Sequence, residues 1–522
     1  MKINRRQFIG SAAAAAALAG VPEAFAAVKE EKVDLVIVGG GLGGLAAANA
    51  AVNKGCKPLV LEKLDFLGGA GLFPEGSLGI GTRYQKEHGI KTTVQQALDA
   101  ALQFHHYRCD PAILRVLFTE SARTIDEIMD MGIELRGIRT MYPENESLMC
   151  WHLFKGGAAA VLQKFIENVK ARGGDLRTGT TVTKLITDRG EVVGVEAVDK
   201  QRNKHIIHAR KVIIATGGFA ANKAMLAQYV FDSSALGMVE PIWLRGPVVD
   251  GRTGDGINMC RVVGAGVTGM HSVAGNAPYL PDVPPINQFS GPDELKQGRC
   301  ALAQPWLWVD HTGKRFFNES RGSVFVDVYN AMTTAGGVLY TIFDQQKMDR
   351  MINKGAVLPF NAIVLANTPL KALPKTWEIG MQRGWAFKAD TVKDLALQIG
   401  VPPENLIETM KKVNSYAEQG RDPEFGRKPE HLEKFDMEKG PYYALKGIRA
   451  FFLTLGGVMV TPNFEAKTPQ GDVIPNLYVI GQDIGGLYDS SYDLRCEGSA
   501  SSFAMTSGRV AAEHALKSIQ GA

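Results

Sequence analysis

Cysteine is scarce in this sequence, and the few cysteines have none of the spacings that hold a metal centre. The 522 residues include six cysteines, and no two of them form a Cys-x-x-Cys pair. Their scatter excludes an attached c-type haem and gives no iron–sulfur or zinc spacing. His105 and His106 have no suitably spaced partner, so we predict no metal site. We expect most of the cysteines to be buried free thiols.

An excess of charge of one sign is also lacking. The formal net charge is +4, and charged residues make up 21% of a chain that is 45% hydrophobic. This balance is typical of a globular protein and gives no reason to expect a nucleic-acid partner. Glycine, in contrast, is abundant, and the 58 glycines suit a fold that brings backbone close to a cofactor. A chain of this length holds two or three domains.

Long hydrophobic runs are absent beyond the first residues. Arg5-Arg6 precedes a soft apolar run from Gly10 to Gly20, and Ala24-Phe25-Ala26 follows as a small-x-small cleavage site. This pattern predicts a twin-arginine signal over residues 1–27, and hence export to the periplasm or another extracytoplasmic location. A core helix or a membrane anchor is the alternative, but the run is too short to cross a bilayer. We therefore expect no membrane span once the signal is removed.

The next part of the chain has the pattern of a dinucleotide-binding unit. Lys32–Val38 is a short apolar run typical of a buried strand, and Gly39–Gly44 follows at once as GGGLGG, which satisfies G-x-G-x-x-G. An Ala-rich helix is expected over Leu45–Asn53, and a second strand over Lys57–Leu61 ends at Glu62. Strand, glycines, helix, strand and acid in this order predict a Rossmann-type βαβ unit.

Each residue of this motif has a separate physical task. Gly39 allows the tight turn, Gly41 lets the backbone approach a pyrophosphate, and Gly44 lets the helix pack on the strand. The start of the helix presents unpaired N–H groups to the anion. Glu62 lies about 20 residues beyond the glycines, where a carboxylate accepts hydrogen bonds from ribose hydroxyls. A glycine-rich turn without a ligand is the alternative interpretation.

Later segments indicate FAD as the dinucleotide. Val192–Val198 and Lys204–His208 are expected to form a hairpin that leads into a buried strand, Lys211–Thr216. A further apolar strand, Leu477–Ile480, precedes a helix that begins near Ser499. The free N–H groups of that helix could stabilise negative charge on a reduced isoalloxazine ring. The cofactor domain therefore starts and finishes at opposite ends of the sequence, with an insertion between.

These motifs resemble the FAD-dependent fumarate reductase and succinate dehydrogenase flavoprotein superfamily. The matching segments lie between Val33 and Arg509 and include VDLVIVGGGLGGLAAA, KVIIATGGFAAN, TGDGINM, GKRFFNES and EGSASSFAMTSGR. The resemblance is to its single-chain exported branch, which has 3-ketosteroid Δ1-dehydrogenases as cousins. It implies an α/β fold in which an inserted α+β cap domain, which binds the substrate, splits a Rossmann-type FAD-binding domain.

The domain boundaries follow from this resemblance. We expect residues 28–270 and 451–522 to form the FAD-binding domain and residues 271–450 to form the cap. Within the cap, Asp390–Gln419 is expected to be a helical stretch. Active sites commonly lie between two such domains, and closure of the cap would exclude water from the hydride step.

Carried over residue by residue, the resemblance implies a set of FAD contacts. Val182 would meet the adenine through its backbone, and Asp255 would lie near the diphosphate or the ribityl chain. Gln482 stands where the family has a Glu that binds the ribityl chain, and Ala500 and Ser501 would face the edge of the flavin ring. The expected cofactor-binding residues are Gly39, Gly41, Gly43, Gly44, Glu62, Lys63, Gly69, Ala70, Gly71, Glu75, Gly76, Val182, Ala215, Thr216, Gly217, Asp255, Gln482, Asp483, Ala500 and Ser501.

Three positions depart from the residues that fumarate-type enzymes use on their dicarboxylate. The family's His-Pro-Thr segment is replaced by Asn276-Ala277-Pro278, and Leu453 stands in place of a second substrate histidine. The reductases' catalytic arginine lies four residues after the Glu of an Asn-Glu pair, where this chain has Ser323. One further family arginine is matched by Arg495. We expect the substrate not to be fumarate, because each lost charged hydrogen bond would cost a dianion about 1.5–3 kcal/mol.

Three residues are our candidates for the chemistry at the substrate. Arg495 would hold an oxyanion of the substrate through its guanidinium. Arg321 would donate a proton if the local backbone compensates for a two-residue shift, and Tyr492 is an alternative acid. Each has a plainer alternative, since Arg321 could be a solvated surface charge and Tyr492 a packed loop aromatic. The apolar segment Phe451–Leu455 is either core or the wall of a substrate pocket.

The resemblance implies hydride transfer between flavin N5 and a carbon of an activated C=C bond. The leading hypothesis is an exported reductase of an enoate, an aryl alkene or an enone. A 3-ketosteroid-type dehydrogenase and a flavin-binding protein without turnover are the two alternatives. Because the chain has no haem or iron–sulfur motif, electrons must reach the flavin from a separate donor, such as a cytochrome, a quinol-linked protein or a flavin carrier.

Overall fold

The computed structural model describes residues 27–140, 148–230, 243–244, 251–283, 288, 291–361, 363–488 and 491–520. The predicted export signal at residues 1–27 lies outside this part, except for Ala27. Within the described part the cysteines are free thiols, and all but Cys56 are buried, as expected. None of the described helices is both long and apolar enough to cross a membrane.

Strand β1 (Val28–Val38) lies in the middle of the cofactor sheet. Its first residues are exposed and its last four are buried, as expected for an apolar run that is covered on both faces. β1 pairs in parallel with β2 (Leu59–Leu61) and with β9 (Lys204–Ile214). The sheet runs in the order β18-β19-β9-β1-β2-β6, and β8 and β7 extend it antiparallel from β9, which confirms the predicted hairpin. The bounds of the other strands are β6 Asp175–Arg177, β7 Thr180–Asp188, β8 Glu191–Asp199, β18 Glu465–Lys467 and β19 Val473–Val479.

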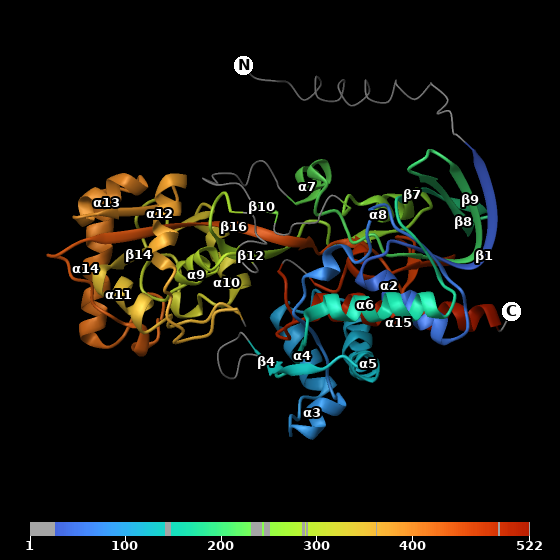
Figure 1. Ribbon diagram of the computed structural model, residues 1–522, viewed down its shortest axis with the longest axis horizontal. Helices are drawn as coiled ribbons and strands as arrows, with labels where there is room; N and C mark the ends of the chain where they lie inside the picture. Colours follow the sequence, from blue (N-terminus) through green and yellow to red (C-terminus); the bar gives the residue numbers. More distant parts are fainter. Residues whose placement is uncertain are drawn as a thin grey trace, which may run out of the picture.

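Two helices from opposite ends of the chain pack on each other beside this sheet (Figure 1). They are α2 (Leu42–Asn53), which follows β1, and the C-terminal helix α15 (Ser499–Gln520). A Cβ added at Gly508 would lie 2.4 Å from the carbonyl oxygen of Gly43, and a Cβ added at Gly43 would lie 3.1 Å from that of Ala504. Only glycine allows so close an approach, so these helices touch backbone to backbone.

The middle of the chain builds a second sheet, and Figure 1 shows it with its helices as a separate lobe. Strand β16 (Tyr442–Thr454) is its centre and pairs with β10, β12, β14 and β15, while β13 pairs with β14. β16 pairs with β12 as far as Thr454, so the cap boundary predicted at residues 450/451 falls inside a strand. The other strands are β10 Trp243–Leu244, β12 Val273–Tyr279, β13 Trp308–Val309, β14 Val338–Asp344 and β15 Ala386–Ala389.

The predicted helical stretch Asp390–Gln419 is two helices in the structure. α13 (Val392–Ile399) ends at Gly400, which has φ +72°, and α14 (Pro403–Gln419) begins after Pro402. A left-handed glycine followed by prolines ends one helix and starts the next. The other helices of the lobe are α9 Asp293–Leu302, α10 Phe325–Thr334, α11 Gln345–Asn353 and α12 Leu373–Arg383.

The remaining elements support the cofactor sheet and connect it to the second sheet. The helices are α3 Arg83–Glu87, α4 Val94–Phe104, α5 Pro111–Asp130, α6 Gly157–Ala171, α7 Lys223–Tyr229 and α8 Asp255–Val262. The strands are β3 Gly76–Leu78, β4 Leu135–Arg139, β5 Trp151–Phe154, β11 Val267–Thr268 and β17 Gly457–Val458. Single 3₁₀ turns occur at Gly69–Leu72, Glu319–Arg321, Pro429–His431 and Gly481–Asp483.

A buried ion cluster lies inside the cap. The guanidinium of Arg315 is 2.6 Å from Glu319 and 2.7 Å from Asp422, and the three side chains are at most 2% exposed. Arg427 lies 3.7 Å from Glu319, and the partly exposed Glu424 lies 3.4 Å from Arg315 at the edge of the cluster. Although burial alone would raise the pKa of Asp422, the hydrogen bonds and charge of Arg315 hold that pKa well below its ordinary value. Glu319 of the Asn-Glu motif is therefore a structural residue here.

Glu319→Gln is expected to destabilise the protein, because it leaves two buried guanidinium groups with one buried carboxylate, Asp422. Breaking a buried pair costs about 3 kcal/mol, which corresponds to a fall of roughly 6–12 °C in the unfolding midpoint. Thermal unfolding followed by circular dichroism measures this shift. Glu134→Gln, which breaks the exposed pair of Glu134 with Lys155, is the control and should leave the midpoint unchanged. Equal midpoints for the two variants would contradict the role of the cluster.

Candidate functional site

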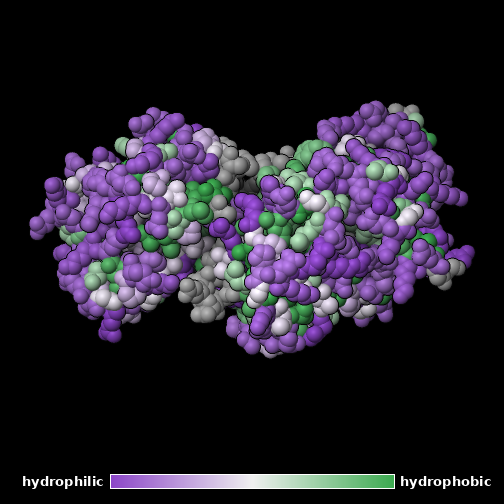
Figure 2. Space-filling model, turned by 60° about the horizontal axis from the view of Figure 1, so that its bottom comes forward, coloured by the Kyte–Doolittle hydropathy of each residue, from purple (hydrophilic) through white to green (hydrophobic). Residues whose placement is uncertain are grey.

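A cavity of about 670 Å³ lies between the cofactor sheet and the cap. It extends from the carboxyl ends of β1 and β9, past the first turns of α2 and α15, to β16 and the start of α10. Figure 2 shows two lobes with hydrophobic residues gathered at the waist between them. A concave, mostly apolar site of this kind between two lobes is suited to a cofactor and a small substrate.

The start of α2 is built to bind an anion. Gly39, Gly41 and Gly43 line the cavity. No side chain caps the helix and its first turn carries no acid, so its first N–H groups are available to a ligand. A Cβ added at Gly41 would contact no atom closer than the carbonyl oxygen of Gly68, at 3.9 Å. The backbone therefore faces the cavity bare, which is what a pyrophosphate requires.

Gly44 has a different task from the other glycines of the motif. It does not line the cavity, and a Cβ added to it would lie 1.9 Å from the carbonyl oxygen of Gly39. This close contact holds α2 against the end of β1, as the motif predicts. Gly44 supports the turn and does not face the cofactor space.

Glu62 is held in place at the edge of the cavity by two backbone amides. Its carboxylate accepts hydrogen bonds from the N–H groups of Gly40 and Leu64, each at 2.8 Å. The side chain lines the cavity, although the residue is only 8% exposed. Because a carboxylate has more acceptor sites than these two bonds use, it can also accept from ribose hydroxyls.

Lys63, the residue after Glu62, lines the cavity together with Asp255, and Val182 lines it too. The Lys63 Nζ atom is 2.6 Å from Asp255 Oδ2 and 2.6 Å from Thr253 Oγ1. Asp255 thus lines the cavity, and its ion pair with Lys63 holds its carboxylate in place. Its position near the diphosphate or the ribityl chain stays a prediction.

Asp483 ties together the ends of two neighbouring strands. Its carboxylate accepts hydrogen bonds from the N–H groups of Gly217 at 3.0 Å and Gly218 at 2.9 Å, and from both the N–H and the hydroxyl of Thr216. Burial raises the pKa of Asp483, and these donors oppose that rise. Asp483 does not line the cavity, whereas its neighbour Gln482 does. Asp483 orients the loop after β9.

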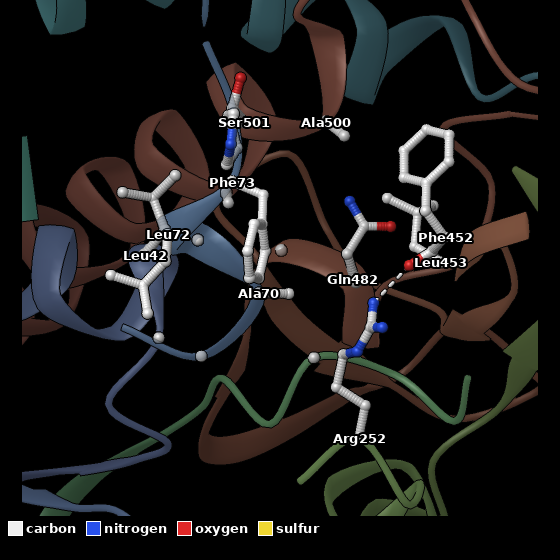
Figure 3. Close-up of a pocket in the computed structure, with 18 of the residues that line it drawn as sticks. Leu42, Ala70, Leu72, Phe73, Arg252, Phe452, Leu453, Gln482, Ala500 and Ser501 are labelled. Carbon is white, nitrogen blue, oxygen red and sulfur yellow. Dashed lines mark hydrogen bonds between the residues drawn. The ribbon is translucent and has the colours of Figure 1, made fainter. Parts of the chain in front are cut away.

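The first turn of α15 forms another wall of the cavity. Ala500 and Ser501 line it together with the 3₁₀ turn Gly69–Leu72 (Figure 3). The Ser501 hydroxyl donates to the carbonyl oxygen of Gly76 at 2.8 Å, which fixes the start of the helix on β3. The positive end of the helix dipole therefore faces the cavity, where it would stabilise negative charge on a bound ring.

The cap side of the cavity is aromatic and apolar. Phe452 and Leu453 of β16 line it together with Tyr492, whereas Phe451 and Leu455 are buried in the core. The ring centroids of Phe452 and Tyr492 are 5.1 Å apart, with an interplanar angle of 82°. This edge-to-face pair gives the cavity a rigid wall that suits a flat apolar substrate. Sequence alone did not decide whether Phe451–Leu455 is core or pocket wall. In the structure some of its residues belong to the core and others line the cavity.

Neither predicted catalytic arginine lines the cavity. Arg321 forms an ion pair with Asp327 in the cap, with 2.8 Å between Nε and Oδ2. Arg495 lies over the ring of Phe104, with its Cζ atom 4.5 Å from the ring centroid. Of the three catalytic candidates, Tyr492 is the one whose side chain reaches the cavity.

The cavity contains a cation that was not predicted from the sequence. Arg252 lines it and is 8% exposed, and its Nη1 atom donates to the carbonyl oxygen of Phe452. Its signal in the sequence was its place directly before the TGDGINM motif. Trp151 and Asn361 also line the cavity without having been predicted.

Most of the predicted cofactor residues meet around this one cavity, and two support it from behind. Those that line it are Gly39, Gly41, Gly43, Glu62, Lys63, Gly69, Ala70, Gly71, Glu75, Gly76, Val182, Ala215, Thr216, Gly217, Asp255, Gln482, Ala500 and Ser501. Gly44 and Asp483 act through the residues beside them. The bare amides of α2, the fixed Glu62 and the first turn of α15 fit the diphosphate, ribose and ring of FAD.

His152 is a structural residue. Both ring nitrogens have partners 2.8 Å away, the hydroxyl of Thr82 and the carbonyl oxygen of Cys150. Burial lowers the pKa of His152 to about 4, so the ring is neutral at physiological pH. In the described part of the chain no cluster of histidines, cysteines and acids is arranged to hold a metal ion.

The fold and the cavity together define a flavoprotein oxidoreductase whose site lies between a dinucleotide-binding sheet and a cap. Residues 34–498 match the FAD binding domain family, and the chain belongs to this family. It is 30% identical to the vinyl phenol reductase of Lactiplantibacillus plantarum over 499 residues, which cover 94% of this chain and 97% of that protein. It is 29% identical to the fumarate reductase (cytochrome) of Shewanella frigidimarina over 502 residues, which cover 95% and 79%. The solved 3-ketosteroid Δ1-dehydrogenase of Sterolibacterium denitrificans has a TM-score of 0.74 at 20% identity, over 93% of this chain and 100% of that one.

These relations confirm several predictions made from the sequence. The cofactor is FAD, the fold is the α/β FAD-binding fold of the fumarate-reductase-like flavoproteins, and the chain is a FAD-dependent oxidoreductase. At 20% identity, the likeness to the steroid enzyme shows the fold alone.

Gly41→Val is expected to abolish FAD loading while the protein stays folded. The added side chain meets no protein atom closer than 3.9 Å, so it points into the space that the pyrophosphate needs. Flavin absorbance after purification, read beside the circular dichroism spectrum, measures both effects. Gly55→Asn, at the far end of α2, is the control, because asparagine tolerates its φ of +81°. A fully yellow Gly41→Val protein would exclude this turn as the diphosphate site.

Proposed function

We propose that this protein is an exported reductase that saturates the C=C bond of a hydroxyaryl alkene of the vinyl phenol type. The observation that carries the proposal is the wall of Phe452, Leu453 and Tyr492. Within this wall, Leu453 stands where the resemblance places a substrate histidine of the fumarate-type enzymes. The chain's 30% identity with a vinyl phenol reductase over nearly the full length of both proteins supports the same substrate class.

The residues of the cavity have different roles in this reaction. The cavity residues from Gly39 to Ser501 would hold FAD, which when bound would supply a hydride to one carbon of the alkene. Phe452 and Phe325 exclude water and hold the flat ring of the substrate. Tyr492 donates the proton that the second carbon requires, because it is the acid from our candidates that reaches the cavity.

We also propose where the protein is located and what supplies its electrons. The Arg5-Arg6 pattern supports twin-arginine export to the periplasm or another extracytoplasmic space. The chain has no motif for a second redox centre, so its electrons come from a separate cytochrome, quinol-linked protein or flavin carrier. A cytochrome is favoured by the relative named fumarate reductase (cytochrome), of which this chain covers 79%.

A substrate panel tests the reaction. With reduced viologen as donor, the purified protein should oxidise the dye with 4-vinylphenol at least about a hundredfold faster than with fumarate. The factor follows from two lost charged hydrogen bonds at about 1.5–3 kcal/mol each. Dye reduction by a saturated 3-ketosteroid would instead support a steroid dehydrogenase, which the same apolar wall favours as second candidate. No reaction with any compound would favour a flavin-binding protein without turnover.

Tyr492→Phe is expected to lower kcat by about 10²–10⁴ and to leave KM and FAD content nearly unchanged, because it removes the proton donor and keeps the ring. Steady-state kinetics with 4-vinylphenol measures this split. Tyr488→Phe is the matched control, since the Tyr488 hydroxyl donates to Ser499 at 2.9 Å and the residue does not line the cavity. Unchanged kcat in Tyr492→Phe would remove Tyr492 from the reaction.

A further inference from the structure

Arg252 is a buried cation with spare hydrogen-bonding capacity that faces the cavity. The residue is 8% exposed, its Nη1 atom donates to the carbonyl oxygen of Phe452, and its Nε atom has no hydrogen-bond partner. Among the described residues, no carboxylate lies within ion-pair distance of this guanidinium. The hydrogen-bonding capacity that remains is therefore available to a ligand of the cavity.

The surroundings of Arg252 favour an anionic ligand. Burial lowers the pKa of Arg252 only to about 10, so the side chain is charged at physiological pH. A buried charge that has no counter-ion costs free energy, and a ligand oxyanion would remove that cost. Among the described residues Arg252 has no such counter-ion, whereas Lys63, which also lines the cavity, is paired with Asp255.

The position of the guanidinium separates it from the diphosphate turn. In Figure 3 the side chain of Arg252 reaches toward Phe452 and Leu453, while Leu42 and Leu72 lie on the other side of the cavity. Leu42 is the first residue of α2, whose amides are the expected diphosphate site. The guanidinium of Arg252 thus lies at the aromatic wall of the cavity, where the proposed function places the substrate.

We infer that Arg252 is the anchor of the substrate and binds the ionised oxygen of a hydroxyaryl alkene. This inference rests on the proposed function and explains why the substrate would need a phenolic oxygen. A planar guanidinium binds a phenolate oxygen with charge-assisted hydrogen bonds. An aryl alkene without that oxygen would leave the buried charge unmatched, so Arg252 determines specificity.

Binding of the phenolate also makes the alkene reactive. The phenolic proton leaves to water on binding, and the oxygen's electron pair moves through the ring toward the terminal carbon of the alkene. That carbon takes the proton of the Tyr492 hydroxyl, the C=C π bond breaks, and a neutral quinone methide forms. Its benzylic carbon would then accept the hydride that the reduced cofactor would supply, which returns the phenolate. The substrate gains two electrons and two hydrogens, and the product oxygen is protonated again on release.

A binding experiment on the oxidised holoprotein tests the anchor without turnover. Titration with 4-chlorophenol should produce a long-wavelength charge-transfer band, because a phenolate stacked on an oxidised flavin donates electron density to it. In Arg252→Met the band should need at least a hundredfold more 4-chlorophenol, and Arg252→Lys should restore part of the affinity. 4-Chlorotoluene, which lacks the oxygen, should give no band with any form. Arg261→Met, on the exposed end of α8, is the matched control and should bind like the wild type.

The kinetic form of the test compares two alkenes. Arg252→Met should lose at least a hundredfold in kcat/KM for 4-vinylphenol and at most about threefold for styrene, with FAD content unchanged. Equal losses for both alkenes, or normal phenolate binding by Arg252→Met, would overturn the inference. Loss of FAD from Arg252→Met would assign the residue to the cofactor and overturn it as well. If the wild type binds the phenolate but does not reduce 4-vinylphenol, the proposed function fails and the anchor stands.

Discussion

The backbone contact between α2 and α15 is the constraint on which the rest of the site depends. Gly43 and Gly508 let the two helices approach until backbone meets backbone, and the first turns of both then open on one cavity. A helix N-terminus carries about half a positive charge. The cavity is therefore polarised at two points without any charged side chain. One of these points suits a diphosphate and the other suits a ring that gains negative charge on reduction.

The cap provides a fixed wall for a second molecule, which the first turns of α2 and α15 do not form. Strand β16 is paired through most of its length inside the cap sheet, and its last residues form the wall of the cavity. The ion cluster around Arg315 and Glu319 holds the chain just before α10, where Phe325 enters the cavity. Because Glu319 belongs to the 3₁₀ turn that comes shortly before that helix, the buried charges fix the position of an apolar side chain in the site.

The parts of the site that sequence predicted well are those set by neighbours along the chain. The strand, the glycine turn and the start of α2 are contiguous, so their signals could be combined, and Glu62 follows at a fixed interval. The orientation of Arg495 depends instead on Phe104, and that of Arg321 on Asp327, so counting along the motif could not determine either. Asp483 was expected to bind the cofactor, but it is satisfied by the loop at Thr216. Arg252 stands directly before the TGDGINM motif, but that place alone could not predict its exposure to the cavity, because this exposure depends on how β16 approaches the cofactor sheet.

The charges of the cavity explain why this scaffold would prefer a ring with one oxygen to a dicarboxylate. A dicarboxylate needs a cationic or hydrogen-bonding partner at each end, because each carboxylate gives up its hydration on entry. Here Leu453 and the ring of Phe452 occupy the wall, so one carboxylate would be desolvated without a partner. A hydroxyaryl group brings one oxygen to one guanidinium and buries its carbons against the same wall. Selectivity then comes as much from this apolar wall as from the presence of Arg252.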